Sequence, residues 1–147
     1  MNALASTGRQ VLVAVYAVFA LAAGARSVVQ LATRADTAPL AYSLSLVAAL
    51  VYLVATLALR RTGPTAYRVA LGAVGFELVG VLVVGTLTAL DGEFFPDQTV
   101  WSAYGVGYGF VPLVLPVAGL WWLLRHRPAD SPVSRSSSRR RPGASGR

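Results

Sequence analysis

The sequence predicts an all-α membrane protein, a four-transmembrane-helix bundle with both termini cytoplasmic and a disordered basic C-terminal tail. Hydrophobic residues make up 55% of the chain, charged residues only 13%, and the mean hydropathy is +0.59. Apolar runs indicate spans at about residues 9–33, 38–59, 67–90 and 100–124. We therefore expect one transmembrane domain over residues 1–125, followed by an Arg/Ser-rich tail over residues 126–147 that is too polar to build a core.

The first run, residues 11–25, lies between Arg9 and Arg26 and would be roughly 22 Å long as a helix. The helical pattern continues as an amphipathic extension to about residue 33, which brings the segment to spanning length. The alternative is a signal peptide that is cleaved after Ala23-Gly24-Ala25. We expect the segment to be retained, because the helical pattern passes through that site.

The second run, residues 38–59, contains no charged residue and is long enough to span a membrane. Pro39 suits a first helical turn, and Thr62-Gly63-Pro64 predicts the turn that follows. Polar and small side chains recur on one face, which we expect to pack against other helices. They are Tyr42, Ser45, Ala49, Tyr52 and Thr56.

The third run is apolar over residues 70–90 except for one acid, Glu77. The face that carries Glu77 is mostly small, so another helix can approach it and supply hydrogen bonds. We expect a neutral, buried acid, because desolvation disfavours the charged form, and we expect Arg26 to lie at a different depth. The acid could be a structural contact, a proton- or cation-coupled site, or the lining of a small cavity. The candidate partners of Glu77 at this polar site are Tyr42, Tyr52, Thr56 and Tyr108.

The fourth run, residues 100–124, places Trp101 twenty residues before Trp121, so that a straight helix would put the two indoles at opposite membrane interfaces. Glycine and proline between them predict a kink or local unwinding and close packing on other helices. The expected packing residues are Gly80 in the third run and Gly105, Gly109, Pro112 and Pro116 in the fourth. Residues 106–109 resemble part of a potassium-channel filter, but the surrounding segments are too short for one.

The arginines predict the topology. Eleven of the 13 fall in the N-terminal segment, the second connection and the tail, whereas the first and third connections hold Arg26, Arg34 and most of the acids. The positive-inside rule therefore places both ends in the cytoplasm of a multi-pass plasma-membrane protein. Because seven arginines follow residue 124, the net charge of +7 favours anionic lipids over nucleic acid as the partner of the tail.

No pattern of catalytic or metal-binding residues is visible. The chain has no cysteine, its single histidine, His126, lies in a basic segment, and only Glu77 is an acid at membrane depth. We expect no cofactor, no metal and no enzymatic activity.

Three stretches resemble small uncharacterised integral membrane proteins of high-GC Gram-positive bacteria: residues 25–52, residues 75–87 and the fourth run from Thr99. The resemblance covers roughly residues 10–125 and implies location and architecture without an activity. Two functions stay open. The first is a non-enzymatic accessory protein that packs against itself or another membrane protein; the second is a small proton- or cation-coupled transporter that uses Glu77 and the broken fourth helix.

Overall fold

The computed structural model describes residues 3–128, and every regular segment in that range is helical. The elements are α1 (Ala3–Arg34), α2 (Pro39–Arg60), α3 (Pro64–Leu90), the 3-10 helix η1 (Ser102–Tyr108) and α4 (Val111–Arg125). The all-helical class is therefore confirmed for these residues. The tail expected at residues 126–147 lies outside the described residues from position 129 onward.

Proline and glycine set the boundaries of the two central helices. Pro39 and Pro64 are the first residues of α2 and α3, where a missing N–H leaves no hydrogen bond unmade. Gly63 precedes α3 with φ of +108°, a conformation that glycine adopts without strain. The second helix matches the expected 38–59 closely, whereas α3 begins three residues before the expected start at 67.

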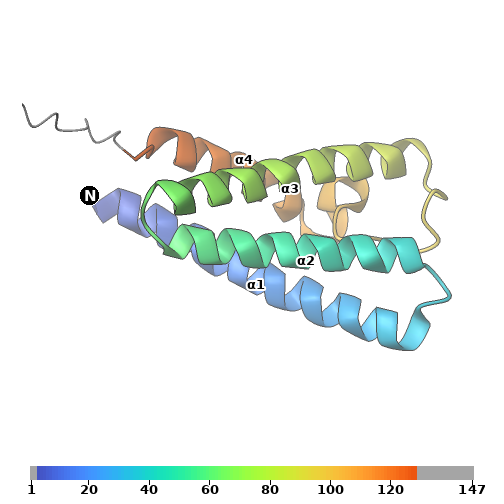
Figure 1. The fold of residues 1–147 in the computed structure, drawn as a ribbon. Helices are drawn as coiled ribbons and strands as arrows, with labels where there is room; N and C mark the ends of the chain where they lie inside the picture. Colours follow the sequence, from blue (N-terminus) through green and yellow to red (C-terminus); the bar gives the residue numbers. More distant parts are fainter. Residues whose placement is uncertain (1–2, 129–147) are drawn as a thin grey trace, which may run out of the picture.

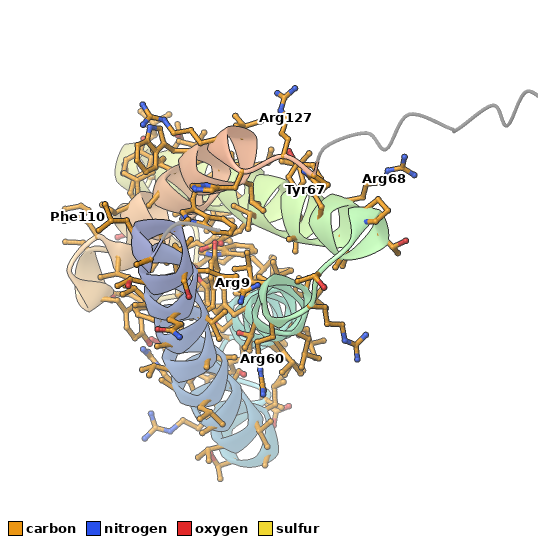
Figure 2. All side chains as sticks on the ribbon, turned by 90° about the vertical axis from the view of Figure 1, so that its left-hand side faces the viewer. Arg9, Arg60, Tyr67, Arg68, Phe110 and Arg127 are labelled. Carbon is orange, nitrogen blue, oxygen red and sulfur yellow. The ribbon has the colours of Figure 1, made fainter. Side chains whose placement is uncertain are left out.

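Helices α1, α2 and α3 lie along the bundle in alternating directions, and α4 lies beside α3 (Figure 1). The start of α1 and the end of α4 lie at one end of the bundle, and the α1–α2 and α3–η1 connections lie at the other. Figure 2 shows Arg9, Arg60, Arg68 and Arg127 at the first of these, which we call the arginine end. The opposite end, with Asp36 in one connection and three acids in the other, is called the acidic end.

The three long helices are apolar enough to cross a membrane, and the bent pair of η1 and α4 would make a fourth crossing if it is counted as one span. Large apolar side chains on the outer surfaces are exposed, among them Leu21 on α1, Leu50 on α2 and Val79 on α3. Such a surface suits lipid better than water. The described structure is therefore that of a multi-pass membrane protein in outline.

A continuous fourth helix over residues 100–124 is not what the structure shows. The chain runs through η1, turns by 102° and only then forms α4, whose 15 residues are roughly 22 Å long. Ala103, Tyr104 and Gly105 have positive φ, and so do Gly109 and Phe110, which a right-handed helix cannot accommodate. The expected unwinding is present, but it separates two segments instead of bending one helix.

This break also changes the position of Trp101. Its side chain is 2% exposed and its ring covers Gly80 of α3, where an added Cβ would lie 2.7 Å from the indole. The expectation that Trp101 marks a membrane interface opposite Trp121 is therefore wrong. With the helix broken at residues 103–105, the twenty intervening residues do not extend along one axis.

Several glycines admit a neighbouring side chain at close range. Gly80 is covered by Trp101, Gly85 by Tyr104, and Gly105 by the ring of Pro112. Gly109 has a different role, because no atom lies within 4 Å of its Cβ position and its φ of +63° serves the turn before α4. Pro112 and Pro116 are both fully buried.

Candidate buried polar site

Glu77 on α3 lies in the interior of the bundle and contacts Tyr16 on α1. The Tyr16 hydroxyl donates a hydrogen bond of 2.7 Å to Glu77 Oε2, and both side chains are 0% exposed. The two residues are 61 positions apart in sequence, so the contact joins helices that are not neighbours along the chain. A hydrogen bond of this kind fixes the rotation and depth of α1 against α3.

The second carboxyl oxygen of Glu77 is different. Glu77 Oε1 is buried and has no hydrogen-bond partner among the described residues. Leaving a buried polar atom without a hydrogen-bond partner costs free energy. The chemistry of this oxygen is confined to accepting or donating a proton, or to binding a cation.

Helix α4 closes the site on a third side. A Cβ at Gly119 would lie 3.4 Å from the Tyr16 hydroxyl oxygen and 3.2 Å from Cγ1 of Val74 on α3. The absence of a side chain at Gly119 therefore lets α4 approach both partner helices. Leu115 and Pro116 on the same helix are buried as well.

Aromatic side chains continue from this pair toward the acidic end. The ring of Tyr16 lies 6.1 Å from that of Tyr52 on α2, whose hydroxyl accepts a 3.1 Å hydrogen bond from Trp101 Nε1. Phe19 packs between Tyr52 and Tyr108, with ring centroids 5.9 and 6.0 Å apart. The site is therefore enclosed by aromatic rings from three elements.

The four expected partners of Glu77 bond elsewhere. Tyr42 donates a 2.9 Å hydrogen bond to Asp97 at the acidic end, and Tyr52 accepts from Trp101. The Thr56 hydroxyl donates to the backbone oxygen of Tyr52 one turn earlier, at 2.7 Å. The depth of these residues and the rotation of α2 bring their hydroxyl groups to other hydrogen-bond partners. Thr56 bonds within its own helix, and Tyr42 and Tyr52 bond to the segment between α3 and α4.

Tyr108 receives its hydrogen bond from Arg26, whose Nη1 lies 2.6 Å from the phenol oxygen. The same guanidinium lies 5.9 Å from the centre of the Tyr108 ring, within the range of a cation–π contact. Arg26 is thus bonded to η1 and not to Glu77, as its expected axial offset from the acid requires.

Sequence reasoning missed Tyr16, although a signal for it was present. Tyr16 lies seven residues from Arg9, or roughly 10 Å along a helix, and Glu77 lies nine residues from Arg68, or roughly 13 Å. Both arginines are at the arginine end, so this count places the two side chains at nearly the same depth. The same comparison of depths along the helices places Arg26 at a different depth from Glu77.

Within residues 3–128, no group of three or more His, Cys, Asp or Glu side chains could hold a metal ion. His126, at the end of α4, stacks on Trp122 with ring centroids 4.5 Å apart. The comparisons of this chain with protein-family models, with curated proteins and with solved structures gave no match. The function must therefore be argued from the site itself.

Proposed function

We propose that the protein is a non-enzymatic accessory protein of the plasma membrane, in which Glu77 and Tyr16 form a structural polar contact. The observation that carries this proposal is the complete burial of Glu77, which has no solvent-exposed surface and is hydrogen-bonded to another transmembrane helix. A coupling or catalytic acid needs access to water and to a substrate, whereas a structural acid does not.

We propose four membrane-embedded segments with both ends in the cytoplasm, the fourth being the bent pair of η1 and α4. The separation of charge between the arginine end and the acidic end supports this orientation. The tail arginines would add an interaction with anionic lipids on the same side.

The proposed partner is a second copy or another membrane protein. Gly80, Gly85 and Gly119 support packing inside the bundle, because each has a side chain of the same chain close to its Cβ position. Gly75 on α3 is partly exposed, and no atom of the described residues lies within 4 Å of its Cβ position. Close approach by a partner helix would therefore occur on the outer face of α3.

Substitution of Glu77 tests the structural role. Glu77→Gln keeps an acceptor for Tyr16 and should melt within a few degrees of the wild type in detergent. Glu77→Leu leaves the Tyr16 hydroxyl buried and unpaired, and should lose about 1–2 kcal/mol of stability. Equal stability of the Leu variant and the wild type would contradict the structural role.

A second candidate is a small proton- or cation-coupled transporter, and two observations favour it. Glu77 Oε1 has no hydrogen-bond partner within residues 3–128, and the fourth segment is broken, as substrate-binding helices in transporters often are. If Glu77 couples transport, Glu77→Gln should fold normally and abolish pH-driven proton movement in reconstituted vesicles. Equal proton leak in vesicles with wild type, Glu77→Gln and no protein would exclude this candidate.

A further inference from the structure

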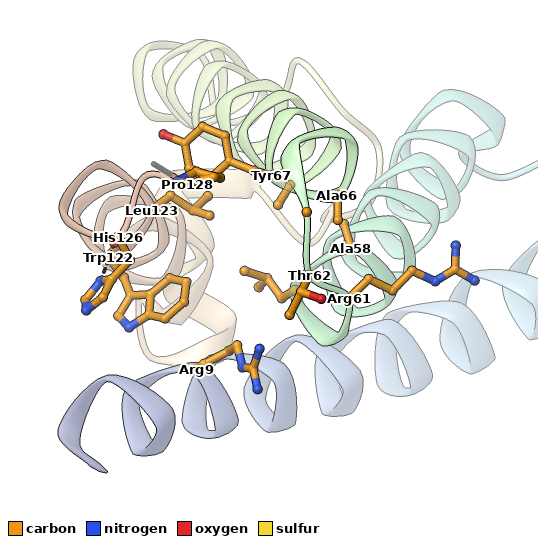
Figure 3. Close-up of a pocket in the computed structure, with 13 residues that line it drawn as sticks. Arg9, Ala58, Arg61, Thr62, Ala66, Tyr67, Trp122, Leu123, His126 and Pro128 are labelled. Atoms are coloured by element: carbon orange, nitrogen blue, oxygen red, sulfur yellow. Dashed lines mark hydrogen bonds between the residues drawn. The ribbon is translucent and has the colours of Figure 1, made fainter. Parts of the chain in front are cut away.

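A hollow of about 210 Å³ opens at the arginine end, between α1, the α2–α3 turn and the end of α4 (Figure 3). Arg9, Arg61 and His126 line it from three different parts of the chain, and no acid among the described residues does. The Arg61 side chain runs away from Arg9, so Arg9 is the basic group that faces the hollow (Figure 3). Figure 3 shows Arg9 facing the space between Trp122 and Thr62. Beneath these polar groups the lining is apolar, with Leu59 and Leu123 both buried.

The wall beside Arg9 also holds an unused donor. Trp122 Nε1 is buried, lies 3.0 Å from the Cβ position of Gly8, and has no hydrogen-bond partner among the described residues. Indole N–H groups usually find a partner when they are buried. This N–H is covered by α1 at Gly8. The positive charge of Arg9 is therefore the feature of the hollow that suits a phosphate group.

An apolar groove between α2 and α3 adjoins the hollow. A neighbouring hollow of about 310 Å³ shares Arg61 and Thr62 with the first, and shares Val54 and Val69 with a third space of about 450 Å³. From Arg61 to Val47 on α2 the groove covers fourteen residues, or roughly 21 Å. That exceeds the ~15 Å of hydrocarbon in one leaflet, so one acyl chain can lie along it.

Gly72 on α3 leaves this groove open. It lines the third space together with Leu50 and Phe76, and no atom lies within 4 Å of its Cβ position. A larger side chain at residue 72 would fill the groove without striking the protein's own atoms.

We propose that the basic hollow and the α2–α3 groove together bind one anionic phospholipid, with its phosphate at Arg9 and an acyl chain beside Gly72. The assignment rests on charge complementarity and on an apolar groove that adjoins the basic hollow. Basic pockets between transmembrane helices are known places for anionic headgroups. The site belongs to the helical bundle and is separate from the tail.

Native mass spectrometry of the full chain in detergent tests the proposal, with dioleoyl phosphatidylglycerol and dioleoyl phosphatidylcholine as probes. The wild type should retain one phosphatidylglycerol at concentrations where phosphatidylcholine is not retained. Arg9→Gln should weaken phosphatidylglycerol binding about five-fold. Arg68→Gln is the matched control, because it removes the same charge at the same end without touching the hollow. Equal weakening by both variants would mean diffuse surface attraction and would overturn the site.

The groove is tested by Gly72→Leu against Gly75→Leu. Both glycines are surrounded by open space on α3, but only Gly72 lines the groove. Gly72→Leu should weaken phosphatidylglycerol binding at least about three-fold, and Gly75→Leu should leave it unchanged. The same affinity in the two variants would overturn the acyl-chain assignment. Displacement of the lipid by an equal concentration of inorganic phosphate would assign the hollow to the free anion and overturn the lipid proposal.

Discussion

A single hydroxyl and a single carboxyl join α1 to α3. Tyr16 donates to one oxygen of Glu77, and the other oxygen has no partner among the described residues, so only one of the two carboxyl oxygens is hydrogen-bonded. The enclosing residues are aromatic or small, and Gly119 brings α4 to the same point. The stability of the bundle should therefore depend on this hydroxyl more than on any other tyrosine hydroxyl near the arginine end.

Tyr16→Phe tests that dependence. The substitution removes only the hydroxyl and leaves both Glu77 oxygens buried without a partner, which should cost about 1–2 kcal/mol. Thermal melting in detergent measures the loss. Tyr67→Phe is the control, because the described residues offer the Tyr67 hydroxyl no hydrogen bond and the side chain is partly exposed. A Tyr16→Phe protein as stable as the control would contradict the structural role of the contact.

At the scale of elements, the segment between α3 and α4 is the unusual one. Trp101, just before η1, packs onto Gly80 of α3, and Tyr104 of η1 packs onto Gly85; the chain then returns into α4 through Gly109. Residues with left-handed backbone conformations occur near both ends of this segment, and Gly105 and Gly109 are the two glycines among them.

Gly105→Ala should destabilise the fold by at least about 1 kcal/mol. Its φ of +80° disfavours a side chain, and an added Cβ would lie 2.6 Å from Pro112 Cγ. Gly107→Ala is the matched control two residues later, because its nearest neighbour is 3.6 Å from the Cβ position and its φ is not positive. The melting temperature of Gly105→Ala should be lower than that of Gly107→Ala. Equal melting temperatures would contradict the described turn.

The elements that the sequence predicts well are long apolar runs bounded by residues that typically end or begin a helix. Arg60 and Pro64 frame the α2–α3 turn, so both helices were placed within a few residues. The fourth segment was misplaced because apolar content alone does not distinguish a straight helix from a broken one. The alternating glycines, and the mere 15 residues between Gly109 and Arg125, were the available signal.

The candidate site was predicted in part. A lone acid in a long apolar run located Glu77, since such residues are rare in membrane helices. Its partner Tyr16 was missed because the rotation of one helix about its axis depends on all its neighbours. Tyr42 and Tyr52 do lie on a buried face, yet they bond to Asp97 and Trp101, which come from segments whose path was not foreseen.

At the scale of the whole molecule, the distribution of arginines between the two ends of the bundle should agree with the orientation of the helices in the membrane. Reporter fusions after residues 35, 64 and 95 should report outside, inside and outside, because the arginine end faces the cytoplasm in our proposal. A fusion after residue 147 should report inside. A reporter after residue 64 on the outer side would overturn the orientation.

The central claim is that Glu77 is sealed inside the bundle, and the access of a water-soluble reagent measures this directly. The folded full chain is treated with a water-soluble carbodiimide and an amine, and the modified carboxyls are located by peptide mass mapping. We expect Asp91 and Glu93, which are exposed, to be modified while Glu77 remains intact, and all three to react after unfolding. Modification of Glu77 in the folded protein as fast as that of Asp91 would contradict the account.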